Sequence, residues 1–377
     1  MESSSITPLL IATLLRSAAV MPINDSPELI ELRKNHDRLQ VEMNKVRRQR
    51  DSVTTQVVQL EGQIEKLERA LNVVDMAEGS AIDPPKWLAK TSKTRNNATV
   101  VAMLSDTHFD EVVLSSEMEG LNAYSRKIAT QRLELWTQNV IHLSQNYLSG
   151  VTYDGMVLML GGDIFSGDIH EELAETNEDS MLGSLLYWSE QVAASIELFS
   201  GTFKKIHVIS VPGNHGRMTR KPRAKLRAKT NFDWLLSKMV ERHFAGNKNV
   251  TFNVPDSADA VVEIYGYRHL LTHGDQAKGG GGIGGIWPTV MRLRARKLQR
   301  YADTGSPFKT IWMGHWHQYI STPELVVNGS MKGYDEYAMM NSFQFQVPQQ
   351  ALAIVTPQHN ITWQCPVFCM DKAKEKW

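Results

Sequence analysis

The sequence predicts an α/β fold preceded by an N-terminal coiled-coil helix. Two observations predict it. After residue 98, short apolar runs rich in β-branched residues alternate with longer helical patterns, as in an α/β sheet. Before that, residues 27–76 keep an unbroken heptad spacing of apolar residues. With 377 residues, of which 42% are hydrophobic, the chain is long enough to bury a sizeable core.

The heptad positions of residues 27–76 alternate in spacing between three and four. The fourteen positions, of which all but His36 and Arg50 are apolar, are Leu29, Leu32, His36, Leu39, Met43, Val46, Arg50, Val53, Val57, Leu60, Ile64, Leu67, Leu71 and Val74. Ser26 and Pro27 suit the start of a helix. The polar positions His36 and Arg50 would fix register, and the pattern favours a parallel homodimer. The alternative is a single helix packed back on the domain.

Composition divides the remaining chain and indicates its location. Residues 1–26 form an N-terminal segment, 77–97 a linker rich in Gly, Pro and polar residues, and 98–377 the globular domain. The apolar residues 8–20 lack a preceding cation and contain Arg16, so they do not resemble a signal peptide. No stretch is long enough to span a membrane. The two cysteines suit a reducing compartment, so we expect a cytoplasmic protein without membrane contact.

Five apolar runs in the globular domain are expected to be strands: 98–104, 155–160, 205–211, 261–272 and 309–313. Helical patterns cover 121–148 and 181–200. Each strand ends in polar residues, which are, in order, Asp106 and His108, Asp163, Asn214 and His215, His273, and His315 and His317. Ligands of open α/β sheets gather at the carboxyl ends of strands. Residues two apart in an extended chain point the same way, so we expect each Asp-x-His or His-x-His pair to face one side.

These side chains offer carboxylate, imidazole and amide donors and no thiolate, which suits divalent metals such as manganese, iron, zinc, cobalt or nickel. The groups are too many for one ion, whereas two ions about 3.5–4 Å apart would use them all. Each motif alone is more often a turn or a satisfied histidine. Five of them in order, each after an apolar run, favour the metal interpretation.

The motifs DTH, GGD, GNH, THGD and GHWH resemble the five blocks of the calcineurin-like metallophosphoesterases, over about residues 98–330. This superfamily includes phosphoprotein phosphatases, cyclic-nucleotide phosphodiesterases and Mre11/SbcD-type nucleases. The resemblance implies an αββα sandwich of mixed sheets. It also implies two divalent ions, with Mn²⁺ the first expectation. Gly329 and Ser330 match a Gly-Ser pair common in the family after the last block.

By position, the resemblance implies a role for each residue. One ion would be held by Asp106, His108 and His317, and the other by Asn214, His273 and His315. Asp163 would bridge the two ions. His215 would face the leaving group as general acid, or orient the phosphate, without binding metal.

Two positions depart from the family pattern. Ser166 occupies a place where an Asp or His usually supports the catalytic histidine, and the nearest acid is Asp168. Gly216 follows the third block where Asp or Glu is usual. The support of His215 is therefore open.

Charge balances at 41 basic and 41 acidic residues, so any preference for a charged substrate must be local. Residues 217–229 and 292–300 are basic and contain no acid. They could grip a phosphate backbone, with Arg217, Arg220, Arg292 and Arg294 as the substrate-binding candidates. The alternative is that both segments are solvated helix faces.

The sequence therefore predicts a dimetal phosphoester hydrolase, in which the ions would generate a bridging hydroxide that attacks phosphorus. A phosphodiesterase or nuclease acting on DNA or RNA is the first expectation. A phosphatase for phosphoproteins or small phosphomonoesters is the second. A coiled-coil assembly protein with an inherited metal site is the third.

Overall fold

A computed structural model of the chain describes residues 27, 31, 34–52, 54–55, 85–88, 96–279 and 285–377. The chain divides into two compact units, Met1–Ala70 and Leu71–Trp377. In the first, residues 34–52 are helical, and Leu39, Met43 and Val46 expose half or more of their surface. Most of the predicted coiled coil lies outside the described residues, as does much of the predicted linker.

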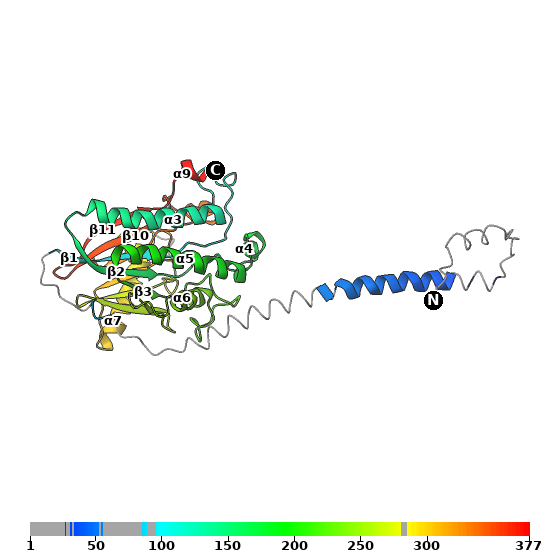
Figure 1. Cartoon of the computed structure of the whole chain (residues 1–377), viewed down its shortest axis with the longest axis horizontal. Helices are drawn as coiled ribbons and strands as arrows, with labels where there is room; N and C mark the ends of the chain where they lie inside the picture. Colours follow the sequence, from blue (N-terminus) through cyan, green and yellow to red (C-terminus); the bar gives the residue numbers. More distant parts are fainter. Residues whose placement is uncertain are drawn as a thin grey trace, which may run out of the picture. The chain divides into compact units, whose positions relative to one another are not determined.

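The second unit contains a six-stranded mixed sheet in the order β11-β10-β1-β2-β3-β4 (Figure 1). Four strands run parallel, and β10 and β11 are antiparallel additions at the β1 edge. The strands are β1 (Asn97–Leu104), β2 (Thr152–Leu160), β3 (Ile206–Ser210), β4 (Val250–Asn253), β10 (Gln349–Thr356) and β11 (Asn360–Phe368). Strand β1 is buried along its whole length, which accounts for its unbroken apolar run.

A second, five-stranded mixed sheet has the order β5-β6-β7-β9-β8. Its strands are β5 (Asp259–Ile264), β6 (Tyr267–Thr272), β7 (Thr310–Met313), β8 (Ile320–Ser321) and β9 (Leu325–Val327). The apolar run 261–272, expected as one strand, forms the β5–β6 hairpin. Its turn is Tyr265-Gly266, and both residues have positive φ.

The two sheets share one apolar core. Met103 and Met159 of the first sheet pack in the same cluster as Val262, Leu271 and Trp312 of the second. Leu88, inside the predicted linker, is fully buried in this cluster. The Leu88 carbonyl also accepts a hydrogen bond from Tyr265 N at 2.9 Å.

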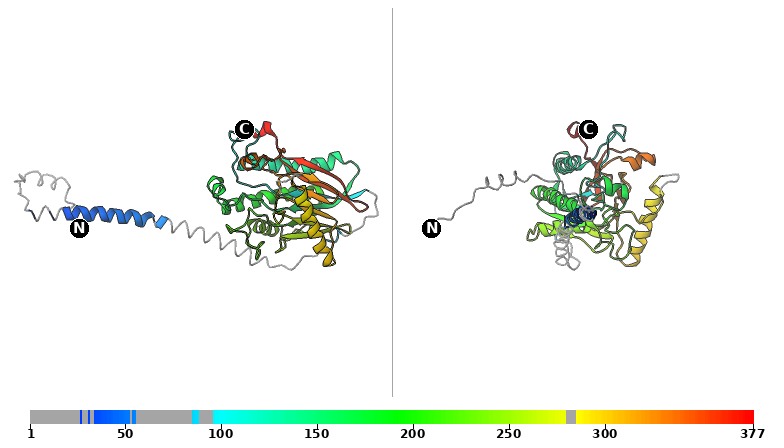
Figure 2. Two further views of the ribbon diagram at one scale, coloured as in Figure 1. Left: turned by 180° about the vertical axis from the view of Figure 1, so that it is seen from behind. Right: turned by 90° about the vertical axis from the view of Figure 1, so that its right-hand side faces the viewer.

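Helices cover the outer faces of both sheets. The helices α3 (Arg126–His142), α5 (Met181–Phe203) and α6 (Phe232–His243) lie on the six-stranded sheet (Figures 1 and 2). Helix α7 (Trp287–Asp303) packs Val290 and Leu293 against the second sheet. The expected αββα sandwich of mixed sheets is confirmed.

Shorter elements complete the fold: the π-helical turn Leu143–Tyr147 and the helices α4 (Glu171–Thr176), α8 (Glu336–Met340) and α9 (Lys372–Glu375). Among the described helices, none has the length and apolar character needed to cross a membrane.

Candidate metal centre

The carboxyl ends of neighbouring parallel strands bring the predicted site loops together. Strand β1 pairs in parallel with β2, and the loops that follow them stay joined. Asp106 N donates to Gly162 O at 3.1 Å, and His108 N donates to Asp163 O at 3.2 Å. In the second sheet, β6 and β7 are also parallel, and Gly314 N donates to His273 O at 2.9 Å. All five predicted motifs therefore follow strands that end at one side of the sandwich.

The first donor group consists of Asp106, His108 and His317, whose nearest side-chain donor atoms lie within 4.8 Å of one another. His108 Nε2 is 3.0 Å from His317 Nε2. Asp106 Oδ1 is 3.6 Å from His317 Nε2. Two ring nitrogens that face each other beside a carboxylate form a set that a cation would satisfy.

The second donor group consists of Asp163, His273 and His315, again within 4.8 Å. His273 Nε2 lies 2.9 Å from Asp163 Oδ2 and 3.2 Å from Asn214 Oδ1. Its other nitrogen, Nδ1, lies 2.9 Å from Gly161 O, and a carbonyl can only accept, so Nδ1 carries the proton. Burial would lower the pKa of His273, but the charge of Asp163 outweighs it and raises that pKa to about 10, so without an ion Nε2 also carries a proton. Nε2 and the two oxygens converge on one place, where a divalent cation would take the place of that proton.

Asp163 belongs to both halves of the cluster, because it also forms a group with His108 and His215. The seven side chains predicted as ligands thus form one cluster, in which Asp163 is shared between the donor groups. The proximity of His215 to this cluster is compatible either with a ligand or with the general-acid role that the family resemblance implies.

Five of the seven predicted ligands have a backbone φ in the left-handed region, and they are Asp106, His108, Asp163, His315 and His317. This conformation is uncommon for residues other than glycine, and it concentrates at functional sites. The chain is therefore not extended in the Asp-x-His and His-x-His motifs. The paired side chains converge because of these turns, and the alternation of an extended strand is not the reason.

His215 is supported by backbone in place of an acidic side chain. Its Nδ1 lies 2.8 Å from Ser166 O, which assigns the proton to Nδ1 and leaves Nε2 free to act. The backbone N–H of His215 donates to Asp163 Oδ1 at 2.7 Å. Ser166 therefore supports His215 by its carbonyl, although its side chain departs from the family pattern.

Burial sets the electrostatics of the cluster. It raises the pKa of Asp106 to about 7 and lowers the pKa of His315 to about 4. Burial alone would raise the pKa of Asp163, but the charges of His273 and His215 outweigh it and hold that pKa well below its usual range. Asp163 is thus the carboxylate most firmly ionised, as a shared ligand must be.

Asp233 is a site residue that the sequence reasoning missed. This buried carboxylate, near the start of α6, accepts from Asp163 N at 3.0 Å, Gly213 N at 2.9 Å and Ile164 N at 3.2 Å. It therefore clamps the loops that follow β2 and β3. A side chain at Gly216 would place a Cβ 2.8 Å from Asp233 Oδ1, which explains the glycine there.

A second clamp holds Asp106. Ser330 Oγ donates to Asp106 O at 2.8 Å, and the Ser105 hydroxyl donates to the Asp106 carboxylate. Asn328 Nδ2 in turn donates to Ser105 Oγ at 2.9 Å. The Asn-Gly-Ser sequence after β9 thus positions Asp106, a predicted ligand.

The four predicted substrate-binding arginines are placed differently. Arg217 donates to the carbonyls of Asn214, Thr219 and Arg220, so it braces the loop after β3. Arg220 is exposed and pairs with Glu171 at 3.1 Å.

The two arginines of α7 also make local contacts. Arg292 is exposed and donates to Thr289. Arg294 pairs with Glu324, which precedes β9 and therefore lies at the opposite end of the β7–β9 pair from His315. The structure does not bring Arg294 to the cluster.

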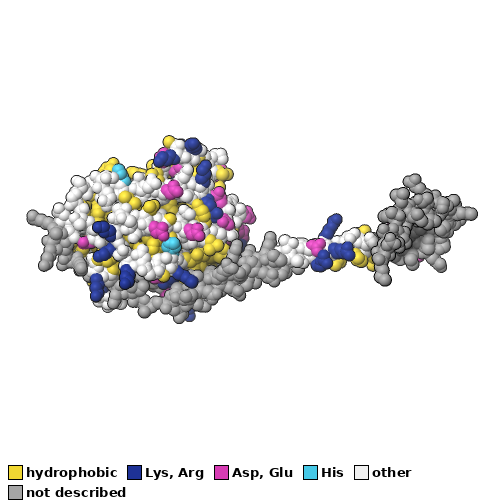
Figure 3. All heavy atoms as spheres, viewed as in Figure 1, with side chains coloured by type: hydrophobic (Ala, Val, Ile, Leu, Met, Phe, Trp, Pro, Cys, Tyr) yellow, Lys and Arg dark blue, Asp and Glu magenta, His cyan; other side chains and the backbone are white. Residues whose placement is uncertain are grey.

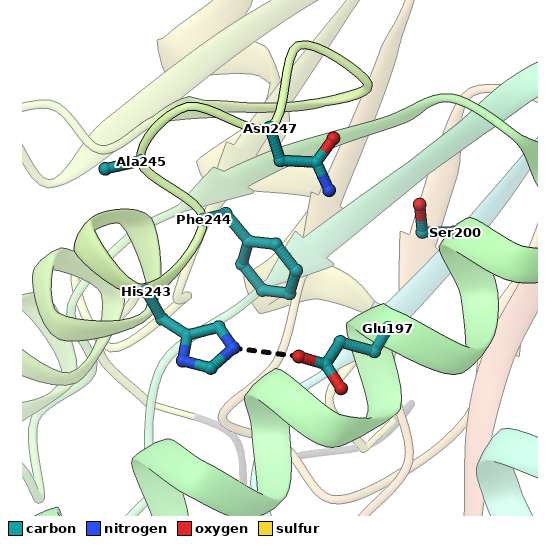
Figure 4. A pocket seen from close by; sticks show the side chains of 6 residues that line it. All are labelled: Glu197, Ser200, His243, Phe244, Ala245 and Asn247. Carbon is teal, nitrogen blue, oxygen red and sulfur yellow. Dashed lines mark hydrogen bonds and ion pairs between the residues drawn. The ribbon is translucent and has the colours of Figure 1, made fainter.

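A pocket of about 310 Å³ lies away from this centre (Figure 4). It lies at and just after the C-terminal end of α6, and its lining residues are Glu197, Ser200, His243, Phe244, Ala245 and Asn247. His243 Nε2 is 2.8 Å from Glu197 Oε1. Asp233, near the other end of α6, faces the cluster, so most of the length of the 12-residue helix separates the pocket from the cluster.

No known family model and no curated protein matches the sequence. Remote likenesses exist among solved structures. A conserved protein of Streptococcus pneumoniae, titled a predicted phosphoesterase, has 13% identity and a TM-score of 0.26, over 71% of this chain and 98% of its own. Zinc-bound Vps29 of Entamoeba histolytica has 13% identity and a TM-score of 0.27, over 71% and 99%.

The sulfate thiohydrolase SoxB of Thermus thermophilus has 11% identity and a TM-score of 0.31, over 74% of this chain and 58% of its own. At such TM-scores these likenesses assign neither a family nor a function to this chain.

Proposed function

We propose that this chain is a dimetal-dependent phosphoester hydrolase, with Mn²⁺ as the first candidate ion, and that it cleaves phosphodiesters of DNA or RNA. The observation that carries the proposal is the overlap of donor groups at one carboxylate. Asp163 joins His108 on one side and His273 with His315 on the other. Two bound ions would neutralise phosphate oxygens and supply a nucleophile at neutral pH.

The residues of the cluster would have different roles in this reaction. Asp106, His108 and His317 would hold one ion, and Asn214, His273 and His315 the other, with Asp163 shared. His215 donates its Nδ1 proton to Ser166 O, so Nε2 is the atom that would take up a second proton and give it to the leaving oxygen, returning the ring to its neutral form. Asp233 would keep the two central loops at a fixed separation.

The support for a nucleic-acid substrate is the loop that follows His215. In it, Lys221, Arg223 and Lys225 are exposed and form no ion pair within the described part of the chain. On the face of the second unit drawn in Figure 3, basic and acidic side chains are interspersed. Exposed cations that follow His215 closely in the chain and form no ion pair suit an extended phosphate backbone.

A substrate panel with Mn²⁺ tests the proposal. Single-stranded and duplex oligonucleotides, a phosphopeptide, bis-p-nitrophenyl phosphate and p-nitrophenyl phosphate are offered to the wild type, His215→Ala and the control His243→Ala. We expect cleavage of oligonucleotides and of the diester, a loss of about 10²- to 10⁴-fold in H215A, and no change in H243A. Dephosphorylation of the phosphopeptide with intact oligonucleotides would replace the nuclease proposal by a phosphatase.

A further inference from the structure

A lysine is buried next to the proposed metal centre, on the segment that follows β9. The side chain of Lys332 is 3% exposed, and its Nζ lies 2.7 Å from Glu111 Oε1. Asp335 is its second carboxylate partner. A buried lysine is unusual unless paired, and here one cation serves two acids.

Glu111 also faces a proposed metal ligand. Its second oxygen, Oε2, lies 3.4 Å from His108 Nδ1. Neither atom has a hydrogen-bond partner within the described residues, and both are buried. A shift of a few tenths of an ångström would bring them into hydrogen-bond range. A small rotation of the His108 ring or of the Glu111 carboxylate would therefore form the hydrogen bond between them.

The opposite nitrogen of the same ring points into the cluster, because His108 Nε2 lies 3.0 Å from His317 Nε2. Histidine ligands of metals usually donate their other N–H to a carboxylate or carbonyl, which fixes the tautomer and the ring orientation. His215 and His273 obtain this support from carbonyls. For His108 the nearest available acceptor is Glu111.

Lys332 is itself held in place by a buried arginine of α3. Arg132, fully buried, donates to Lys332 O at 2.6 Å and pairs with Glu375 at 2.9 Å. The backbone one residue earlier also contacts the site, since Met331 N donates to Asp106 O at 3.3 Å. The lysine therefore cannot move away without disturbing a buried ion pair.

We propose that Glu111 and Lys332 are positioning residues for His108: Lys332 holds the Glu111 carboxylate, and Glu111 accepts the Nδ1 proton so that Nε2 faces the ion. The inference rests on the proposed function, because it presumes that His108 binds metal. Lys332 acts through Glu111 and touches neither ion nor substrate.

The test measures metal affinity directly. Metal-free wild type, Glu111→Gln and Asp335→Asn are titrated calorimetrically with Mn²⁺, and the visible spectra of their Co²⁺ forms are compared. Lys332 Nζ and His108 Nδ1 face different oxygens of Glu111, and in E111Q one of these two positions is an NH2 group, which can only donate, so the glutamine cannot accept from both. We expect E111Q to weaken one of the two ions by about 10- to 100-fold and to alter the Co²⁺ spectrum.

Asp335→Asn is the matched control, because Asp335 also pairs with Lys332 but acts on the ligand His317 only through its charge, whereas the carboxylate that faces the His108 ring nitrogen is that of Glu111. It should lower the affinity clearly less than E111Q does, and Lys332→Arg, which keeps the charge, should largely retain both affinities. Glu111→Asp, a milder change in case E111Q unfolds, should also weaken one ion. Unchanged affinities in E111Q or in folded E111D, or an equal loss in D335N, would overturn the inference. Failure of the wild type to bind any ion would instead overturn the proposed function.

Discussion

His108 Nε2 lies 3.0 Å from His317 Nε2, although 209 positions separate the two residues in the chain. Burial lowers the pKa of both rings, that of His317 to about 3, so neither is protonated to the imidazolium near pH 7. Two neutral rings can share one hydrogen between these nitrogens, or both lone pairs can face a cation. The adjacent Asp106 carboxylate favours the cation.

We predict that metal-free protein takes up two Mn²⁺ ions per chain and that Asp163→Ala binds neither tightly, because the shared carboxylate belongs to both donor groups. His317→Ala should lose one ion only. Calorimetric titration and elemental analysis measure the stoichiometry. His243→Ala, which removes an exposed imidazole paired with Glu197, is the control and should bind two. Two tight ions in D163A would contradict a shared ligand.

We predict that Gly216→Ala destabilises the fold and weakens metal binding. The added Cβ would lie 2.6 Å from Asn231 Oδ1 and 2.8 Å from Asp233 Oδ1. The Asp233 side chain would have to move, and it would lose hydrogen bonds that it accepts from backbone N–H groups such as that of Asp163. We expect a loss of about 1–3 kcal/mol in the free energy of unfolding, measured in urea without metal.

The matched control is Gly201→Ala. Gly201 lies inside α5 with no atom within 4 Å of an added Cβ, so alanine should stabilise the fold by about 0.5–1 kcal/mol. Equal effects of the two substitutions would mean that the contact with Asp233 is not what requires glycine at position 216.

The sequence was informative where local pattern and fold agree. Buried parallel strands such as β1 read as continuous apolar runs, so their ends, and the polar residues after them, could be located. Short strands were not found. Strands β8 and β9 contain two and three residues, too few to show a period. Sheet order was likewise not derivable, because β10 pairs with β1 across most of the domain.

For the site, the identities of the clustered residues followed from motif spacing, but their supports did not. Asp233 lies inside a helical stretch, and nothing in the sequence distinguishes it from an ordinary first-turn acid. The carbonyl of Ser166 supports His215, and a backbone group leaves no signature in residue type. Arg294 was predicted to bind substrate, but it pairs with Glu324. A basic stretch of sequence shows that positive charge is present and does not show towards which face of the domain the side chains point.

We predict an acid-dependent loss of stability to which His207 contributes together with other buried histidines, such as His269 and His315. Burial lowers the pKa of His207 to about 4, whereas an unfolded histidine titrates near 6.5. Below about pH 6.5 the unfolded chain therefore binds a proton at this histidine, whereas the folded chain does not. The free energy of unfolding falls as the pH is lowered from about 6.5 to about 4. His207→Gln should reduce the slope of the urea midpoint against pH between pH 6.5 and 5 by the share of one proton, while the other buried histidines keep the rest of the slope. His243→Gln, at an exposed site, should leave the wild-type slope.

We predict that residues 27–76 join two copies of the chain and that the heptad face makes the contact. Val46 is a heptad position and Val41 is not, yet both are more than 60% exposed in the single chain. Val46→Glu would bury a charge in the seam, whereas Val41→Glu would stay in solvent. Sedimentation equilibrium should show a monomer, or a much weaker dimer, for V46E and an intact dimer for V41E. Similar behaviour of the two variants would contradict this register.

We predict that the loop after His215 contributes to binding of nucleic acid. Reversing Lys221, Arg223 and Lys225 to Glu removes three exposed cations that have no ion-pair partner in the described part of the chain. The KM for an oligonucleotide should rise, and the salt dependence of binding should fall by about one unit of slope for each phosphate that the loop no longer neutralises. The kcat for bis-p-nitrophenyl phosphate should stay near the wild-type value, because that small diester reaches only the metal centre.

The control is Arg294→Gln. The Arg294 guanidinium pairs with Glu324, just before β9 and away from the cluster, so the KM for the oligonucleotide should not change in this variant. An increase in KM for both substrates in the triple variant would indicate a damaged centre and would contradict a backbone-binding loop.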